Sequence, residues 1–244
     1  MLKNLLNGLD IPKGEILFLH VKLKGISSKL PYSDISKNII NLLNEYYEPK
    51  TILVPTFTYS FTKTGIFNKS NTPSEVGRFS EEIRISYSAE FRTSNPVFNL
   101  IDTNNFFKSW DIDHSSAFAK NSHLDLLSKE GYVILNINLP ELINTHLHYL
   151  EYKNRVPYRF VKFFQGDIVH EDNSVEKISY HYYVRDLDID TAWRREKIKD
   201  FLIKNKILKE KFFKNIGVNW MNTKELDKYI DCELNENKQF LIEN

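Results

Sequence analysis

The feature that most constrains the fold of this chain is a strand–helix–strand pattern near its start. Residues 16–21 form a short apolar run, which is typical of a buried strand. Behind Ser33, a predicted N-cap, apolar residues recur at helical spacing, and Pro49 ends this segment before a second apolar run at residues 51–54. A helix that joins two neighbouring strands in this way gives a parallel pair. The sequence therefore predicts a layered α/β fold.

The middle of the chain continues the alternation of helices and strands. Residues 72–75 have the form of a capping box with proline at the first helical position, so a helix is predicted to begin there. Ser122 predicts the start of another helix, which Gly131 ends before the strand-like residues 132–138. Residues 55–71 are too long for an ordinary connection, and we expect them to form a binding loop.

The last third of the chain changes character. Three short strand-like runs predict an antiparallel hairpin or meander, at residues 160–164, 167–170 and 177–184. Helical patterns follow at residues 191–205 and 223–229, and the run of charges at residues 197–214 is most simply interpreted as a solvated helical surface. We expect residues 1–244 to form a single domain, since 244 residues with 41% hydrophobic content can bury a full core.

Charge and cysteine content exclude several classes of protein. Lysine and arginine total 33 against 32 acidic residues, so no net charge attracts nucleic acid or an anionic membrane. The single Cys232 rules out a disulfide framework, and we interpret it as an incidental thiol rather than a nucleophile. The first residues are too polar for a signal peptide, and no apolar run approaches the roughly 20 residues of a membrane span. We therefore expect a cytoplasmic protein that neither binds nucleic acid nor inserts into a membrane.

Residues 145–151 carry the clearest chemical signal. His148 and Glu151 are three positions apart, so on a helix they share one face, and the carboxylate can orient the imidazole. Such a pair can act as a general base. The strand-like run directly before it would place the pair near the C-terminal edge of a parallel sheet, where α/β folds bind ligands. The simpler alternative is an ordinary surface pair.

A zinc site is another alternative for this segment, because His146, His148 and Glu151 are close in sequence. On a helix, however, the two histidines point about 200° apart, and on a strand Glu151 faces away from both. No cysteine or aspartate completes a set of three or four ligands in this segment. We therefore expect no metal.

Five segments, in the same order along the chain, resemble the aminoglycoside 3-N-acetyltransferase (antibiotic N-acetyltransferase) family, in particular its surface-polysaccharide-associated branch: residues 17–26, 51–58, 72–77, 92–96 and 145–151. The resemblance covers residues 1–165 and leaves residues 166–244 as a strand hairpin and a C-terminal helical part. It implies a layered α/β/α sandwich around a mostly parallel or mixed sheet, with a small antiparallel strand extension and C-terminal helices, and not the common GCN5-like acetyltransferase fold. It also implies acetyl-CoA, or another acyl-CoA, as the donor, with His148 in proton transfer from the acceptor amine and Glu151 in its support.

The resemblance also assigns binding residues. It implies CoA contacts from His20, Val21, Lys22, Leu23, Thr56, Phe57, Thr58, Arg92 and Ser94, and acceptor contacts from Thr145, Arg155, Tyr158 and Arg159. The family usually has two serines where this chain has Val21 and Lys22, so the donor contacts differ here.

Alternatives stay open for several of these residues. His20 can be a buried structural histidine, Arg92 can pair with a neighbouring helix, and Arg155 and Arg159 can be solvent-exposed. For the donor that stabilises a tetrahedral oxyanion, the candidates are the backbone amides of residues 56–58 and the hydroxyl of Thr145.

The resulting hypothesis is an acyl-CoA-dependent N-acetyltransferase that acetylates an amine of a sugar by direct transfer, without an acyl-enzyme. Arg155, Arg159 and Lys162 beside a single glutamate favour an anionic acceptor, which indicates a nucleotide-linked amino sugar of surface polysaccharide biosynthesis. Acetylation of an aminoglycoside, which would confer antibiotic resistance, is the first alternative, and a non-catalytic sugar-binding relative is the second. The expected partners are a small amino sugar and CoA, and a homodimer stays open.

Overall fold

A mixed sheet lies at the centre of the computed structural model, which describes residues 2–26, 31–139 and 141–243. The strands of this sheet are β1 (Ile16–Val21), β2 (Thr51–Pro55), β4 (Leu100–Asp102), β5 (Val133–Ile137), β8 (Lys209–Phe213) and β9 (Ile216–Asn222). Their order across the sheet is β4-β2-β1-β5-β9-β8. The central strands β2, β1 and β5 are parallel, whereas β4, β9 and β8 each run antiparallel to their neighbours.

The strand–helix–strand unit predicted near the start of the chain is confirmed. β1 and β2 pair in parallel, and α2 (Tyr32–Tyr47) joins them. Ile35 and Ile39 are fully buried on one face of α2, so the helical spacing of apolar residues determines which side packs on the sheet. The predicted N-cap at Ser33 is wrong, because the carbonyl of Pro31 already accepts a hydrogen bond from the Ile35 amide and Ser33 lies inside the helix.

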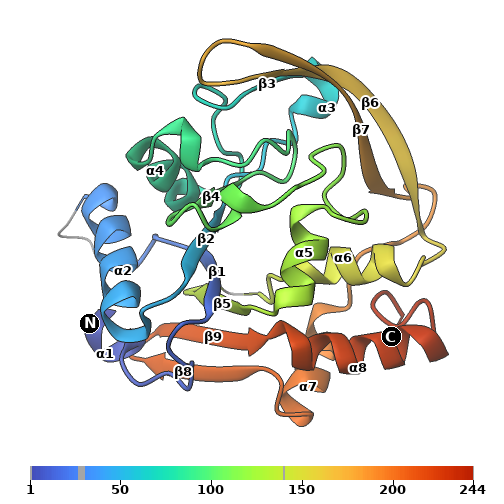
Figure 1. Cartoon of the computed structure of the whole chain (residues 1–244). Helices are drawn as coiled ribbons and strands as arrows, with labels where there is room; N and C mark the ends of the chain where they lie inside the picture. The colour runs from blue at the N-terminus through green and yellow to red at the C-terminus, as the bar shows by residue number, and fades with distance from the viewer. Residues whose placement is uncertain (1, 27–30, 140, 244) are drawn as a thin grey trace.

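Helices cover both faces of the central sheet (Figure 1). On one face lie α1 (Leu2–Leu6), α2 and α4 (Arg78–Ser86), and on the other lie α5 (His123–Glu130), α6 (His146–Lys153), α7 (Arg195–Lys204) and α8 (Thr223–Glu236). Consecutive side chains of β1 alternate between the two cores: Phe18 packs with α5 to α8, and Leu17 and Leu19 pack with α1, α2 and α4. This arrangement confirms the expected α/β/α sandwich.

A second sheet arches over the helices α5 and α6 (Figure 1). Its strands are β3 (Ile66–Asn68), β6 (Arg159–Val169) and β7 (Val175–Arg185), in the order β3-β6-β7. β6 and β7 form one continuous antiparallel hairpin, so the three short strands predicted here are wrong in their boundaries. The expected break near Gly166 is absent, because Gly166 pairs with Ile178 inside the ladder. Short helical segments complete the fold: α3 (Phe61–Thr64) and the 3₁₀-helices η1 (Ala89–Phe91) and η2 (Phe106–Ser109).

Gly166 lies where α3 approaches the hairpin, and a side chain does not fit there. A Cβ atom at this position would lie 2.6 Å from the Phe61 ring and would also overlap the carbonyl oxygen of Gly65. We expect Gly166→Ala to lower the free energy of unfolding by about 2 kcal/mol, because overpacking forces the backbone apart. Urea unfolding measures this, with the exposed Gln165→Ala on the same strand as the control. Equal stability of the two variants would show that the contact is loose.

Residues 72–75 do not begin a helix, contrary to the prediction. The Glu75 carboxylate instead accepts hydrogen bonds from the backbone N–H (3.0 Å) and the hydroxyl of Ser60. α4 begins only at Arg78, after Gly77, whose φ of 110° is outside the helical range. The predicted capping box required the Glu75 side chain, but this side chain contacts Ser60 instead.

The charge run at residues 197–214 is not a single helical surface. It contains the end of α7 and then the strand β8, which pairs antiparallel with β9. Lys209 forms an ion pair with Asp10 (2.6 Å), and Lys211 donates to the carbonyl of Asn7 (2.6 Å). These lysines therefore connect the sheet edge to the N-terminal segment instead of facing solvent freely.

The lengths of the helices bear on membrane insertion. α2 has 16 residues, and a bilayer requires about 20 apolar ones. Within the described ranges, no helix combines the length and the apolar character that a membrane span needs. That residues 1–244 form one domain stays a prediction.

Candidate active site

His148 and Glu151 meet on α6 as their spacing predicts. The His148 Nδ1 lies 2.8 Å from the Glu151 Oε2, and the two side chains are 31% and 0% exposed. α6 follows β5 through a short loop, so the pair lies beside the C-terminal ends of the parallel strands. Because Nδ1 faces the carboxylate, Nε2 is the ring nitrogen left to take a proton.

Glu151 is a fully buried carboxylate with three partners. Besides His148, it accepts a hydrogen bond from the Trp193 Nε1 (2.8 Å), and the Arg159 Nε lies 2.8 Å from its Oε2. Burial alone would raise the pKa of Glu151, but the hydrogen bond from His148, the nearby positive charges and the bond from Trp193 together hold this pKa below its ordinary value. The carboxylate is therefore ionised at neutral pH.

The environment of His148 keeps its ring neutral. Burial lowers the pKa of His148 below its ordinary value, although the hydrogen bond and the charge of Glu151 act in the opposite direction. A neutral imidazole carries one proton, here on Nδ1 toward Glu151, and has a free lone pair on Nε2. At neutral pH the side chain is thus in the form that a general base requires.

Trp193 contacts both His148 and Glu151, although the sequence analysis did not identify it. Its ring stacks on His148 with centroids 4.4 Å apart and planes at 34°, while its N–H holds Glu151. It precedes α7 and lies 42 residues from Glu151 in the chain. The tryptophan therefore fixes both members of the pair from a segment that was predicted only as a helix.

His20 forms a second hydrogen-bonded chain at the end of β1. Asn136 donates its amide to the Ile143 carbonyl and the Asn219 side chain (2.9 Å each), so its oxygen faces the His20 Nδ1 at 3.0 Å. His20 Nδ1 must then donate, and Nε2 accepts from the Thr145 hydroxyl at 3.3 Å. Burial lowers the pKa of His20 to about 4, which keeps this ring neutral as well.

Two cavities meet at His148. The strand-end cavity, of about 350 Å³, is lined by His20, Phe57, Thr145, Trp193 and other residues at the strand ends. The hairpin cavity, of about 800 Å³, is lined by Arg159, Lys162, Tyr182, Asp186, Asp188 and neighbouring residues of β6 and β7. His148 and Tyr59 line both cavities. His148 therefore lies where two ligands can approach, one from each cavity.

The residues predicted to contact CoA fall into different places. Val21 and Phe57 line the strand-end cavity with His20, whereas Leu23 is 3% exposed in the apolar core. Lys22 lines a further cavity next to the strand-end cavity. Thr56 and Thr58 are fully buried, and their amides donate to the carbonyls of residues 99 and 97 (2.9 Å each). Among residues 56–58, the Phe57 amide is thus the remaining candidate for an oxyanion donor.

Arg92 lines neither cavity around His148, so its predicted contact with CoA stays a prediction. It is 1% exposed, and its guanidinium donates to the carbonyls of Lys69 (3.0 Å), Thr72 (2.7 Å) and Thr56 (3.1 Å) and to the Asn99 side chain (2.9 Å). These bonds shape the loop after β2 from inside. Ser94, predicted with it, lines a separate cavity together with Arg92.

The residues predicted to contact the acceptor also lie in different places. Thr145 lines the strand-end cavity, and Arg159 lines the hairpin cavity while it pairs with Glu151. Tyr158 is 1% exposed and packs in the core below α6. Arg155 lies at a different surface depression, next to Lys153. The structure therefore brings two of the four residues to His148.

His146 has a structural role. Its Nε2 donates to the Asp227 carboxylate on α8 (2.5 Å), and its Nδ1 accepts from the Tyr132 hydroxyl (2.8 Å). Asp231 on the same helix binds Lys153 at the other end of α6 (2.5 Å). α8 thus holds α6 at both ends. Within the residues that the structure describes, no group of three or more histidine, cysteine or acidic side chains could hold a metal ion.

The buried neutral histidines predict an acid-sensitive fold. Burial lowers the pKa of His20 to about 4 and that of His123 to about 3, from 6.5. The unfolded chain therefore binds more protons than the folded one below pH 6.5, and the free energy of unfolding should fall as the pH drops from 6.5 toward 4. Urea unfolding at several pH values measures this loss. His123→Met should make the slope shallower, and an unchanged slope would contradict the prediction.

Known proteins resemble this chain in sequence and in structure. A profile of the family described as aminoglycoside 3-N-acetyltransferase matches residues 18–232. The solved structure of the aminoglycoside acetyltransferase AAC(3)-IVa has 14% identity and a TM-score of 0.71, with 100% of this chain and 90% of that chain covered. AAC-IIIb, solved as a binary complex with CoASH, has 14% identity, a TM-score of 0.73 and coverage of 96% and 95%. YokD from Bacillus subtilis has 16% identity, a TM-score of 0.69 and coverage of 97% and 98%. No curated protein matches the sequence.

Proposed function

Because this chain belongs to the aminoglycoside 3-N-acetyltransferase family, we propose that it transfers the acetyl group of acetyl-CoA to an amino group of an aminoglycoside-type amino sugar, with His148 as the general base. The observation that carries this proposal is the position of His148. Its side chain lines two cavities, and Glu151 holds its Nδ1, which leaves Nε2 to take a proton. This is the geometry that direct transfer between two bound substrates requires.

The reaction follows from this geometry. The acceptor amine, bound from the hairpin cavity, attacks the thioester carbonyl of acetyl-CoA, and His148 Nε2 takes one proton from the nitrogen as the new C–N bond forms. The tetrahedral intermediate then collapses, the C–S bond breaks, and CoA leaves as the thiolate, which takes up a proton. The ionised Glu151 stabilises the imidazolium during this step.

Of the candidates named for the oxyanion donor, the Phe57 amide fits best. The Thr145 hydroxyl donates its only proton to His20, and the Thr56 and Thr58 amides are engaged with backbone carbonyls. Phe57 lines the strand-end cavity, where the thioester would lie. The Thr145 oxygen retains lone pairs, so it can accept a hydrogen bond from a substrate N–H.

The charges around the hairpin cavity bear on the acceptor. The sequence argument for an anionic acceptor counted Arg155, Arg159 and Lys162. Of these, Arg155 lies elsewhere, Arg159 is neutralised by Glu151, and Lys162 lines the cavity. Asp186 and Asp188 line the cavity and suit a polyamine such as an aminoglycoside. These observations, together with the family, favour the aminoglycoside over the nucleotide-linked sugar.

A nucleotide-linked amino sugar stays as the second candidate acceptor. Lys162 and Arg185 line the same hairpin cavity as the two aspartates, and their charges suit a diphosphate. The acceptor can therefore be decided only by comparing the two classes of compound directly.

The purified protein should release free CoA thiol from acetyl-CoA when an aminoglycoside such as gentamicin or sisomicin is added, and the acceptor should gain the mass of one acetyl group. Nucleotide-linked amino sugars and the corresponding free amino sugars form the comparison set. Turnover of the nucleotide-linked sugars alone would replace the aminoglycoside by the second candidate. Tight binding of an acceptor without thiol release would contradict the catalytic proposal and support the sugar-binding alternative.

A further inference from the structure

The indole ring of Trp193 lies over the face of the His148 imidazole. The two ring centroids are 4.4 Å apart and the planes differ by 34°, so the rings are stacked at a tilt. Rings in edge-to-face contact stand nearly perpendicular, and rings side by side in one plane cannot bring their centroids so close. The face of an indole carries negative charge density and attracts a cation within about 6 Å of its centroid. A protonated His148 ring would therefore lie on a surface that attracts it.

The edge of the same indole contacts the carboxylate of the pair. The Trp193 Nε1 donates to the Glu151 Oε1 (2.8 Å), whereas the His148 Nδ1 lies 2.8 Å from Oε2. The two carboxylate oxygens thus have different partners, which fixes the orientation of the Glu151 side chain. One indole therefore places its positive edge at the anion and its negative face at the base. This arrangement suits an ionised Glu151 beside a protonated His148.

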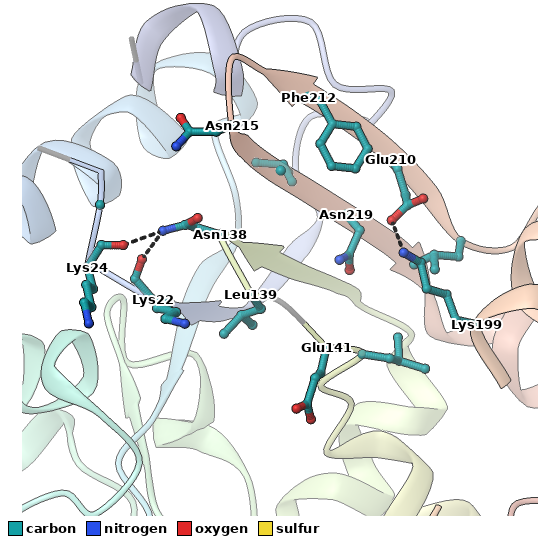
Figure 2. Close-up of a pocket in the computed structure, with 15 residues that line it drawn as sticks. Lys22, Lys24, Asn138, Leu139, Glu141, Lys199, Glu210, Phe212, Asn215 and Asn219 are labelled. Atoms are coloured by element: carbon teal, nitrogen blue, oxygen red, sulfur yellow. Dashed lines mark hydrogen bonds and ion pairs between the residues drawn. The ribbon is translucent and has the colours of Figure 1, made fainter. Parts of the chain in front are cut away.

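The backbone next to Trp193 is held by contacts outside the catalytic pair. The Arg194 amide donates to the Leu241 carbonyl (2.9 Å) in the C-terminal segment. Arg195 forms an ion pair with Glu141, in the loop that follows β5. Figure 2 shows the Glu141 side chain among the residues that line the cavity next to the strand-end cavity. The position of the indole is therefore supported by two distant parts of the chain.

Other groups around His148 also affect its charge. Glu151 favours the protonated ring, and Arg159, whose Nε lies 2.8 Å from the same carboxylate, disfavours it. Phe118 is a second aromatic neighbour, but its ring centroid is 6.4 Å from that of His148, where the attraction is weaker. The two cavities add the following titratable or charged residues: His20, Tyr59, Lys162, Tyr182, Arg185, Asp186, Asp188 and Arg195. Of the two aromatic neighbours, Trp193 is thus the one placed to stabilise a cation.

We propose that Trp193 is a positioning residue of the reaction, which stabilises the protonated His148 ring through the face of its indole while its N–H holds Glu151. This inference rests on the proposed function, in which the acceptor nitrogen forms the C–N bond with its electron pair and gives one proton to His148 Nε2. The neutral imidazole becomes an imidazolium in this step, so a positive charge develops against the indole. An attraction that strengthens only as this charge develops lowers the barrier and not the energy of the bound substrates.

Fluorinated tryptophans test this role, because each fluorine withdraws charge from the face of the ring, changes its shape little and leaves the N–H in place. In protein that contains mono-, di- or trifluorotryptophan, kcat should fall stepwise, by about 3- to 30-fold in total, with the KM for acetyl-CoA unchanged. The acid limb of kcat/KM should move to lower pH, because a weaker attraction for the cation lowers the pKa of His148. A kcat that does not depend on fluorine, or a limb that moves to higher pH, would overturn the inference.

Trp193→Phe, labelled in the same way, is the matched control, because its remaining tryptophans are Trp110 and Trp220. It should be slower than the wild type, since phenylalanine cannot donate to Glu151, but its rate should not depend on the number of fluorines. An equal dependence in both proteins would assign the effect to the other two tryptophans and would also overturn the inference.

Titration of the His148 ring by NMR provides a readout without turnover, and comparison with His148→Gln identifies its signal. The measured pKa of His148 should fall with each added fluorine in the wild type and stay constant in labelled Trp193→Phe. If the wild type acetylates no amine, the proposed function fails, but this titration still decides whether the indole stabilises the protonated ring. A pKa that is the same at every level of fluorination would refute that contact.

Discussion

Replacing His148 by glutamine should lower kcat by about 10²–10⁴-fold while the protein stays folded. The His148 side chain lines both cavities, and the glutamine side chain cannot take a proton from the acceptor amine. Steady-state rates of thiol release measure the loss. The KM for acetyl-CoA should stay close to that of the wild type, because the proposed role of His148 is to take a proton from the acceptor and not to bind the donor.

The matched control for this variant is His170→Gln at the tip of the β6–β7 hairpin. His170 pairs with Glu176 near the end of β6 and lines neither cavity around His148. It should retain full activity. Turnover that survives in a correctly folded His148→Gln protein would remove the base from the mechanism, whatever the acceptor.

Replacing Glu151 by glutamine should affect stability, rate and pH dependence together. Loss of the buried charge leaves Arg159, which is 11% exposed, without its partner, and we expect a loss of about 3 kcal/mol in the free energy of unfolding. The imidazolium also loses its counter-charge, so kcat should fall by about 100-fold. Urea unfolding and steady-state kinetics on one sample measure both effects.

The pH profile separates the catalytic role of Glu151 from its structural one. The charge and the hydrogen bond of Glu151 raise the pKa of His148 against the effect of burial. Without the charge this pKa falls further, so the acid limb of kcat/KM should move to lower pH. Glu225→Gln, on the exposed side of α8, should change none of these quantities. A limb that moves to higher pH would contradict the role assigned to Glu151.

Sequence patterns correctly predicted those helices and strands that depend on residues close together in the chain. The apolar runs of β1, β2 and β5 and the helical spacing of α2 and α5 appear in the structure close to their predicted bounds. The Ser122 hydroxyl accepts from the Asp125 amide (3.3 Å), as an N-cap should. The hairpin β8–β9 was not predicted, because its charged residues form a strand only through pairing with β5 and contacts with the N-terminal segment.

The active-site pair could be predicted for the same reason, and its surroundings could not. His148 and Glu151 are neighbours on one helix, so their spacing determines their contact. Trp193 and Tyr59 reach the same point from distant segments, and nothing in their local sequence distinguishes them from core aromatics. Arg92 shows what a matching segment cannot predict, because its guanidinium donates to backbone carbonyls of a buried loop that lies far from it in the sequence.

The attachment of α6 to α8 has a consequence for how the protein is made. His146 and Asp227 are 81 residues apart in the chain, so at 5 to 20 residues per second a ribosome needs roughly 4 to 16 s to supply the anchor after the catalytic helix has been synthesised. During this interval the nascent chain contains His148 but lacks the helix that holds α6 in place. Proteolytic clipping or a frameshift near the C-terminus would therefore abolish activity without touching a single substrate contact.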